Sequence, residues 1–285
     1  MTQKHRRNRL FALATLVASL VVCAPAHADP VVLKTTELGH GPTIVFVHSL
    51  GSSRSDWMPT ARKLLAHYRV VLVDLPGHGD SALPEPFSFA TVGEALDGVL
   101  AKQNPDSTII VAHQFGGRAA LAALAAHPGR AKGLVLLDVP LGVPMQIDDQ
   151  QKKQFLDFMD NQYEAVQRMM FSKLGRDTTQ SALIFAMFSQ TQPATVKAFV
   201  REGFYSDGNK DAKAVKVPIQ LVATSRLWKP EMSSGAVLRQ LGWEDTTAAV
   251  RRLADSAYWA MKDQPDTLAA IIGQFAAARF APAKK

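Results

Sequence analysis

Short runs of β-branched residues alternate along this chain with segments of about ten to fifteen residues that carry helical spacing. The strand-like runs near residues 45, 71, 110 and 135 are almost wholly apolar, which is typical of strands covered on both faces. This alternation predicts an α/β fold, a mostly parallel sheet with helices on both faces. The expected strands are Val31–Thr36, Thr43–His48, Val70–Asp74, Thr108–Ala112, Gly133–Asp138, Pro218–Ala223 and Ala248–Leu253, and the expected helices are Trp57–His67, Thr91–Lys102, Gly117–His127 and Asp266–Arg279.

One long segment interrupts the alternation. From about Leu141 to Lys213 no strand pattern occurs, and the helical patterns are rich in Met and Phe. An insertion of this length between two strands predicts a helical cap over 141–213, with the core formed by 29–140 and 214–285. The Met and Phe side chains either pack the cap helices together or line an adaptable apolar pocket.

The first 28 residues have the features of a secretory signal peptide. Basic residues between Lys4 and Arg9 precede an apolar stretch from Leu10 to Cys23, and Ala26-His27-Ala28 matches the small-x-small cleavage pattern. We therefore expect export to the periplasm or the extracellular medium after cleavage following Ala28. An uncleaved anchor is the rival interpretation.

Most of the excess positive charge lies in that segment. The formal net charge is +7, and removal of residues 1–28 takes away four basic residues and no acidic one, which leaves +3. We therefore expect no nucleic-acid partner. The remaining chain has no cysteine, because Cys23 is the only one, so it offers neither a disulfide nor a thiol nucleophile. No second apolar stretch long enough to span a membrane follows.

Four short segments mark a candidate site. Val45–Ser53 reads VFVHSLGSS, Asp74–Ser81 reads DLPGHGDS, Val111–Gly117 reads VAHQFGG, and Lys262–Pro265 reads KDQP. In this order and at these spacings they resemble the α/β-hydrolase fold family, across nearly all of the expected mature chain. The resemblance implies a Ser-His-acid triad whose nucleophile lies on a sharp turn, the elbow, between a strand and a helix.

Gln114 occupies the position that matches the family's nucleophile. Ala112, Gly116 and Gly117 keep the small residues that surround such an elbow. A carboxamide is not a useful nucleophile near pH 7, but it offers two hydrogen-bond donors and an acceptor. Gln114 therefore either fills the former nucleophile space or donates hydrogen bonds into a pocket beside the elbow N–H groups.

The other two triad positions also lack their usual side chains. The resemblance implies a histidine seven residues before Pro265, where the chain has Tyr258, and no histidine follows His127. The acid position, counted from the proline that opens the next-to-last strand, is occupied by Leu227. Asp138 matches an alternative acid position and is a candidate leftover acid, with no histidine to orient. We therefore expect no catalytic triad.

Several residues around the elbow are candidate ligand contacts. His48 begins the loop that in the family supplies an oxyanion-hole N–H, and His113 directly precedes the elbow. Both match structural positions of the family, so we expect neither catalysis nor metal binding from them, and no cofactor. Tyr258 either packs against the elbow or donates its hydroxyl to a ligand or to Gln114. The candidate ligand-binding residues are Gln114, Phe115, His48, Ser49, Leu50, His113 and Tyr258.

These substitutions favour an exported pseudoenzyme that binds a small apolar or carbonyl-containing ligand in the retained elbow pocket. A first alternative is a hydrolase or lyase that acts on ester- or amide-like substrates through a non-standard site around Gln114, Tyr258 and His48. A second alternative is an interaction module that binds a protein partner through its cap.

Overall fold

The computed structural model describes residues 31–142, 147–244, 246 and 248–281, so the expected signal peptide lies outside the described residues. Seven strands form one sheet in the order β1-β3-β2-β4-β5-β6-β7. The pairs are parallel except for β1, which is antiparallel to β3. The strands are β1 (Thr35–Leu38), β2 (Thr43–Val47), β3 (Arg69–Val73), β4 (Thr108–His113), β5 (Leu134–Leu137), β6 (Ile219–Thr224) and β7 (Ala249–Leu253).

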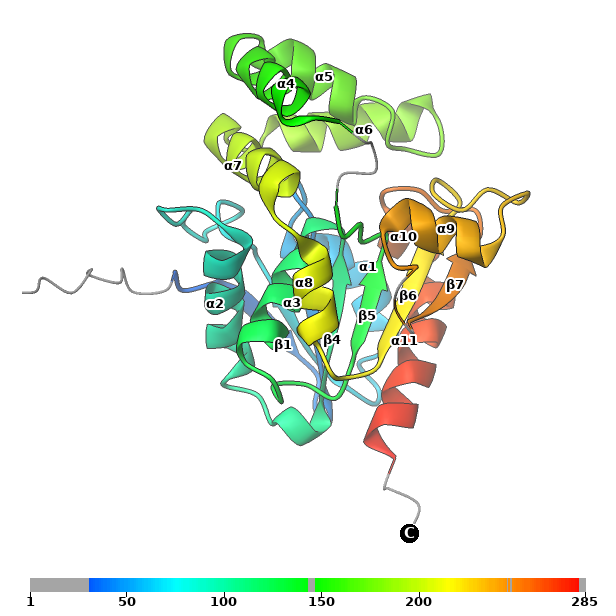
Figure 1. The fold of residues 1–285 in the computed structure, drawn as a ribbon. Helices are drawn as coiled ribbons and strands as arrows, with labels where there is room; N and C mark the ends of the chain where they lie inside the picture. The colour runs from blue at the N-terminus through cyan, green and yellow to red at the C-terminus, as the bar shows by residue number, and fades with distance from the viewer. Residues whose placement is uncertain (1–30, 143–146, 245, 247, 282–285) are drawn as a thin grey trace, which may run out of the picture.

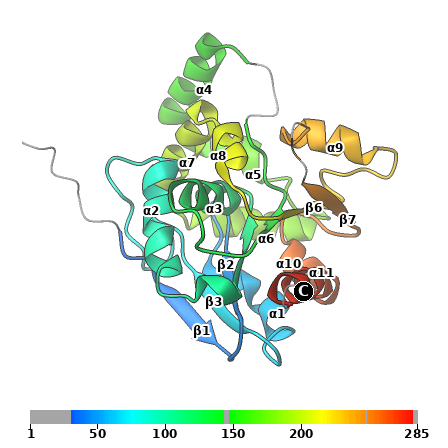
Figure 2. The same ribbon diagram turned by 60° about the horizontal axis from the view of Figure 1, so that its bottom comes forward.

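Helices cover both faces of this sheet. In the described part of the chain they are α1 (Met58–Arg62), α2 (Phe89–Leu100), α3 (Phe115–Ala126), α4 (Asp149–Asn161), α5 (Tyr163–Phe171), α6 (Thr178–Ser189), α7 (Pro193–Tyr205), α8 (Gly208–Ala214), α9 (Ser234–Leu241), α10 (Ala260–Asp263) and α11 (Pro265–Phe280), with 3₁₀ turns η1 (Arg54–Trp57) and η2 (Pro105–Ser107). Helices α2, α3 and α8 lie together on one face, and α1 and α11 lie on the other (Figures 1 and 2). This is the α/β architecture expected from the alternating pattern.

The central strands are buried on both faces, which explains their continuous apolar runs. In β2, Val45 and Val47 belong to the core beneath α2, α3 and the inserted helices, whereas Ile44 and Phe46 belong to the core beneath α1 and α11. Successive side chains of a strand point to opposite faces, so each central strand contributes to both cores.

The inserted helices α4 to α8 lie between β5 and β6 in the sequence. Helices α4, α5 and α6 lie beyond the carboxyl ends of the parallel strands, at the top of Figure 1, and α7 leads back to the core. Helix α8 packs along α3. The carboxyl ends of β2, β4 and β5 are therefore brought together beneath helices, at the edge of the sheet where ligands bind in open α/β folds.

Two expected elements differ from the structure. The first strand is Thr35–Leu38 instead of Val31–Thr36, because the edge strand pairs with β3 through residues that are only partly buried. The helix expected over 57–67 ends at Arg62. The N–H groups of Lys63 and Leu64 bond to carbonyls three residues earlier, so the segment closes in tighter turns.

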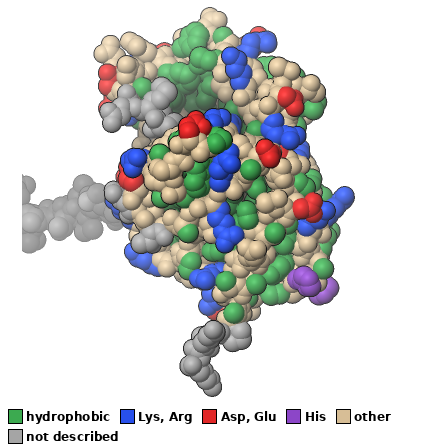
Figure 3. Space-filling model, turned by 90° about the vertical axis from the view of Figure 1, so that its right-hand side faces the viewer, with side chains coloured by type: hydrophobic (Ala, Val, Ile, Leu, Met, Phe, Trp, Pro, Cys, Tyr) green, Lys and Arg blue, Asp and Glu red, His purple; other side chains and the backbone are tan. Residues whose placement is uncertain are grey.

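No helix in the described ranges is long and apolar enough to cross a membrane. On the face shown in Figure 3, basic and acidic side chains are interspersed, with hydrophobic side chains between them.

Candidate functional site

Gln114 lies at the junction of β4 and α3 in a conformation that non-glycine residues rarely adopt. Its φ is 43° and its ψ is −113°, and its N–H donates to the carbonyl of Leu137 at 3.0 Å. The following helix packs very closely: a Cβ at Gly116 would lie 2.2 Å from the carbonyl oxygen of His48, and one at Gly117 would lie 2.2 Å from a methyl group of Val139. The elbow geometry is therefore present with a carboxamide at its apex.

The Gln114 side chain is oriented by its neighbour on the facing loop. Its Oε1 accepts a hydrogen bond from the Ser49 hydroxyl at 3.4 Å. Among the described residues its Nε2 has no hydrogen-bond partner, and Gln114 is only half-buried. The amide donors are thus available to a bound molecule.

Two backbone N–H groups stand at the positions that match the family's oxyanion-hole donors. They belong to Leu50, on the loop after β2, and to Phe115, directly after Gln114. Neither N–H has a hydrogen-bond partner within the described ranges. The loop is held by Gly51, whose N–H donates to Nε2 of His78 at 2.9 Å.

His48 and His78 are buried and bound to backbone groups. Nδ1 of His48 donates to the Ser49 carbonyl at 2.7 Å, and its Nε2 accepts the Leu75 N–H at 3.0 Å. His78 donates from Nδ1 to Pro76 at 3.0 Å. Burial lowers the pKa of His48 to about 4 and that of His78 to about 3. Both rings are therefore neutral near pH 7 and have no free nitrogen for proton transfer.

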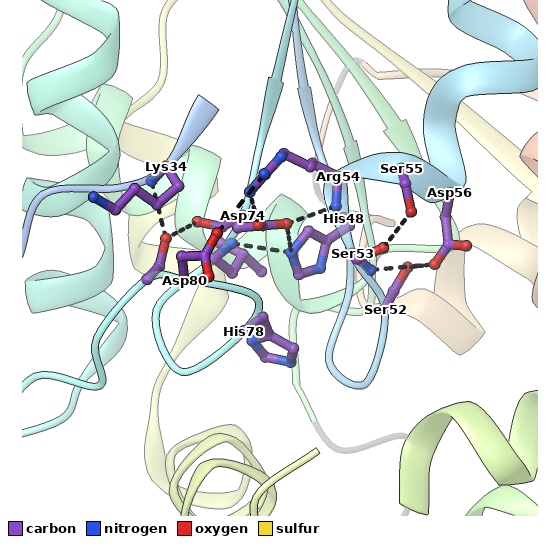
Figure 4. Close-up of polar contacts among 12 residues, drawn as sticks. Lys34, His48, Ser52, Ser53, Arg54, Ser55, Asp56, Asp74, His78 and Asp80 are labelled. Carbon is purple, nitrogen blue, oxygen red and sulfur yellow. Dashed lines mark hydrogen bonds and ion pairs between the residues drawn. The ribbon is translucent and has the colours of Figure 1, made fainter. Parts of the chain in front are cut away.

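The loop over 74–81 is tied to the same cluster through Asp74. This buried carboxylate accepts the Arg54 N–H at 2.8 Å, forms an ion pair with the Arg54 guanidinium, and lies 3.7 Å from Nε2 of His48 (Figure 4). A Cβ at Gly79, which has φ of 54°, would lie 2.1 Å from Asp74 Oδ2. The residues of this segment therefore have structural roles in the loop.

His113 is fully buried, and both of its ring nitrogens lack a partner in the described structure. Burial, assisted by the positive charge of Arg226, lowers its pKa to about 3. Its ring lies edge-on to the Tyr258 ring, with centroids 4.9 Å apart.

Tyr258, at the position that matches the family histidine, is also buried. Its hydroxyl donates to the carbonyl of Leu50 at 2.6 Å, and its ring packs against Phe188 of the inserted helices at 5.5 Å. Burial raises the pKa of the Tyr258 hydroxyl, and the nearby Ser49 hydroxyl partly opposes this rise. The Tyr258 hydroxyl therefore holds the loop after β2 in place.

The two candidate acid positions, Asp138 and Leu227, lie just beyond β5 and β6. Asp138, at the end of β5, accepts the N–H of Thr224 at 2.8 Å and its hydroxyl at 2.6 Å. Burial raises the pKa of Asp138, whereas Arg226 and Thr224 oppose that rise. Asp138 thus joins the ends of β5 and β6, and Leu227 is a partly buried core side chain just beyond β6.

A cavity of about 200 Å³ opens beside the elbow. Of the seven predicted ligand contacts, Gln114 and Phe115 line it, whereas His48, Ser49, Leu50, His113 and Tyr258 lie around the elbow without lining it. Met170 and Phe204 belong to the Met- and Phe-rich insertion, for which pocket lining was one of the two expectations. The other lining residues were not anticipated from the sequence; they are Arg118, Pro140, Gly142, Val200 and Gly203. Arg118 had a signal, since it is the one charged residue in the apolar helix α3.

Within the described ranges, no group of three His, Cys, Asp or Glu side chains is arranged to hold a metal ion. The polar groups at the elbow are hydrogen-bond donors, so the arrangement is suited to binding an oxygen atom of a ligand.

A mostly parallel sheet with a strand–elbow–helix turn under inserted helices defines an α/β-hydrolase architecture. A family model described as alpha/beta hydrolase fold matches residues 42–223, and the chain therefore belongs to the α/β-hydrolase fold family. This confirms the family expected from the four segments.

Curated relatives match only part of the chain. Pimeloyl-[acyl-carrier protein] methyl ester esterase of Pseudoalteromonas atlantica is 32% identical over 107 residues, which are 37% of this chain and 40% of the relative. 2-Succinyl-6-hydroxy-2,4-cyclohexadiene-1-carboxylate synthase of Yersinia pseudotuberculosis is 36% identical over 81 residues, 28% of this chain and 29% of the relative. The chain thus spans less than half the length of these relatives.

Solved structures match nearly the whole described fold. An enol-lactonase from Burkholderia xenovorans has a TM-score of 0.70 at 18% identity and covers 87% of this chain and 97% of its own. A thermophilic esterase from Thermogutta terrifontis has a TM-score of 0.72 at 18% identity, with 89% and 97% covered. At this identity the likeness shows a common fold.

Proposed function

We propose that this protein binds a small, largely apolar ligand through a carbonyl or carboxylate oxygen and lacks serine-hydrolase chemistry. The observation that carries the proposal is the state of Gln114: it stands in the elbow conformation on the cavity wall, with its amide donors unpaired among the described residues. A carboxamide in that place can hold an oxygen atom but cannot attack a carbonyl carbon.

The surroundings of Gln114 support this role. Phe115, directly after Gln114, also lines the cavity, and its N–H has no hydrogen-bond partner within the described ranges. Met170, Val200 and Phe204 supply apolar wall. Ligand sites commonly combine a mainly apolar lining with a few placed polar groups, and their volumes are about 300–1,000 Å³. The smaller cavity here suits a small ligand.

A second candidate function is hydrolysis of an ester- or amide-like substrate. The names of the relatives and structural neighbours favour it, since they include esterases and an enol-lactonase. In this candidate Gln114, Tyr258 and His48 would orient a water molecule. The hydrogen bonds of His48 and Tyr258 to backbone groups weigh against it, because neither side chain is free to move a proton.

Hydrolysis and binding are measured together on residues 29–285. The wild type, Gln114→Ala and Gln114→Glu are tested for turnover of a short-chain nitrophenyl ester and for binding of small ketones, amides and carboxylates by calorimetry. We expect no turnover above buffer, and binding that weakens by about tenfold or more in Gln114→Glu, where a carboxylate repels the ligand oxygen. Exposed Gln190→Glu is the control for added charge.

Turnover that disappears in Gln114→Ala would support the hydrolase candidate and overturn the binding proposal. Binding that is the same in all four proteins would show that Gln114 is not the polar anchor.

We also propose that the protein is exported and cleaved after Ala28. Its charge pattern and the Ala26-His27-Ala28 sequence support this. Mass spectrometry of the protein recovered from a secreting bacterial host tests it: a chain that begins at Asp29 is expected, and an intact N-terminus in the cytoplasm would contradict it.

A further inference from the structure

Arg118 is a buried cationic residue that lines the cavity. It lies in α3, four residues after Gln114, and only 3% of the residue is exposed. Gln114 directly precedes the first residue of α3, and both Gln114 and Arg118 line the cavity. A Cβ at Gly208 would lie 2.6 Å from Nε of Arg118, so the absence of a side chain at Gly208 makes room for the guanidinium.

The guanidinium is only partly satisfied by the protein. Its Nη2 donates to the hydroxyl of Ser206 at 2.9 Å and to the Ser206 carbonyl at 3.3 Å, and its Cζ lies 4.9 Å from the centre of the Phe89 ring. Nε is buried without a partner, and Nη1 makes no hydrogen bond within the described residues.

The described part of the chain provides no ion-pair partner for Arg118 within 4.0 Å. Three acidic residues act on it from a longer distance: Asp211, Asp207 and Glu202. Two of them already accept backbone N–H groups, Glu202 from Phe89 and Asp207 from Asn209. A buried charge without a close partner is unfavourable. The Arg118 guanidinium would therefore attract an anion that enters the cavity.

We propose that the ligand is a small organic acid whose carboxylate binds the Arg118 guanidinium and whose apolar body fills the rest of the cavity. This rests on the proposed function, because it assigns a charge to the ligand of the same cavity. A carboxylate matches a single guanidinium in charge and shape.

A single ligand that carries two oxygen-bearing groups could contact both Arg118 and Gln114. Gln114 and Arg118 line the same cavity, so an acid with a second carbonyl along its chain would present one oxygen to each of them. A 5-oxo acid is therefore expected to bind more tightly than the simple acid of equal length.

Calorimetry with residues 29–285 tests the assignment. The probes are straight-chain carboxylates from butanoate to decanoate, the corresponding primary amides, and 5-oxohexanoate. An amide keeps the carbonyl and the chain but has no charge. We expect the best acid to bind the wild type about ten- to a hundredfold more tightly than its amide. In Arg118→Met this preference should disappear while amide binding stays the same.

Arg201→Met is the matched control, because this substitution removes the same charge from an exposed position. Arg201 lies on α7 next to Val200, which lines the cavity. Amides that bind as tightly as acids to the wild type would overturn the role of Arg118 and leave the proposed function standing, even if Arg118→Met fails to fold. A wild type that binds neither acids nor amides would overturn both proposals.

Discussion

Replacement of His113 by Phe tests the electrostatics of the buried elbow. Burial lowers the pKa of His113 from 6.5 to about 3, and neither ring nitrogen has a partner in the described structure. Between these values the unfolded chain binds a proton on this side chain and the folded chain does not. The free energy of unfolding must therefore fall as the pH falls below 6.5, and the contribution of His113 is complete only above that pH.

The size of the effect follows from the two pKa values. One pKa unit corresponds to about 1.36 kcal/mol, so between pH 7 and pH 5 this single side chain should remove about 2 kcal/mol from the free energy of unfolding of the wild type. His113→Phe removes the titrating group and keeps an aromatic ring against Tyr258. Between pH 7 and pH 5 the free energy of unfolding of the variant should therefore fall by about 2 kcal/mol less than that of the wild type.

Urea denaturation at pH 7, 6 and 5 measures this difference. His48 and His78 also have lowered pKa values, but they are unchanged in the variant and cancel in the comparison. Exposed His40→Gln is the control and should follow the wild type. If His113→Phe loses as much free energy of unfolding as the wild type, then His113 is protonated equally in both states, and its assignment as a dry, neutral ring is wrong.

Further predictions concern the three positions that match the triad and the alternative acid position, Asp138. Tyr258→Phe should lower the free energy of unfolding by about 1–3 kcal/mol, because a buried carbonyl loses its donor; unchanged urea midpoints would contradict this. Asp138→Ala should cost about 2–4 kcal/mol in the same assay, because the buried N–H and hydroxyl of Thr224 lose their acceptor, and a loss below 1 kcal/mol would argue against the pairing. Gln114→Gly should be about 1 kcal/mol more stable than Gln114→Ala, since only glycine is unstrained at this φ; the reverse order, usual at ordinary positions, would show an unstrained elbow. Gln114→Ser alone should not hydrolyse nitrophenyl esters, whereas Gln114→Ser with Tyr258→His and Leu227→Asp is the smallest set expected to do so, and fast hydrolysis by the single variant would refute the assignment of the histidine position.

The fold could be predicted from the sequence because its central strands are runs of apolar residues that are buried on both faces. β2 and β4 lie within a residue of their expected bounds, since both of their faces are covered. The edge strand β1 and the short helix α1 were placed less accurately, because pairing and tight turns define them instead of apolar periodicity.

The site was only partly accessible. The motif around Gln114 located the elbow, and the Met- and Phe-rich insertion was one expected source of pocket wall. Val200, by contrast, reaches the cavity from α7 through packing that no local pattern encodes. The hydrogen bond of Tyr258 to the Leu50 carbonyl joins residues 208 positions apart, and no sequence pattern in either segment predicts it.

The preserved elbow is itself a product of packing. Gly116 and Gly117 allow α3 to approach the His48 carbonyl and Val139 closely after the sharp turn at Gln114, and this chain makes that turn with a carboxamide at its apex. Elbow geometry therefore does not distinguish an enzyme of this family from a binding protein. The functional groups do: here the elbow presents amide donors, the neighbouring histidines are neutral and mostly bonded to backbone, and a buried guanidinium stands one helical turn away. In the proposed function these groups hold an oxygen atom of the ligand, and Gln114 offers no hydroxyl or thiol at the elbow.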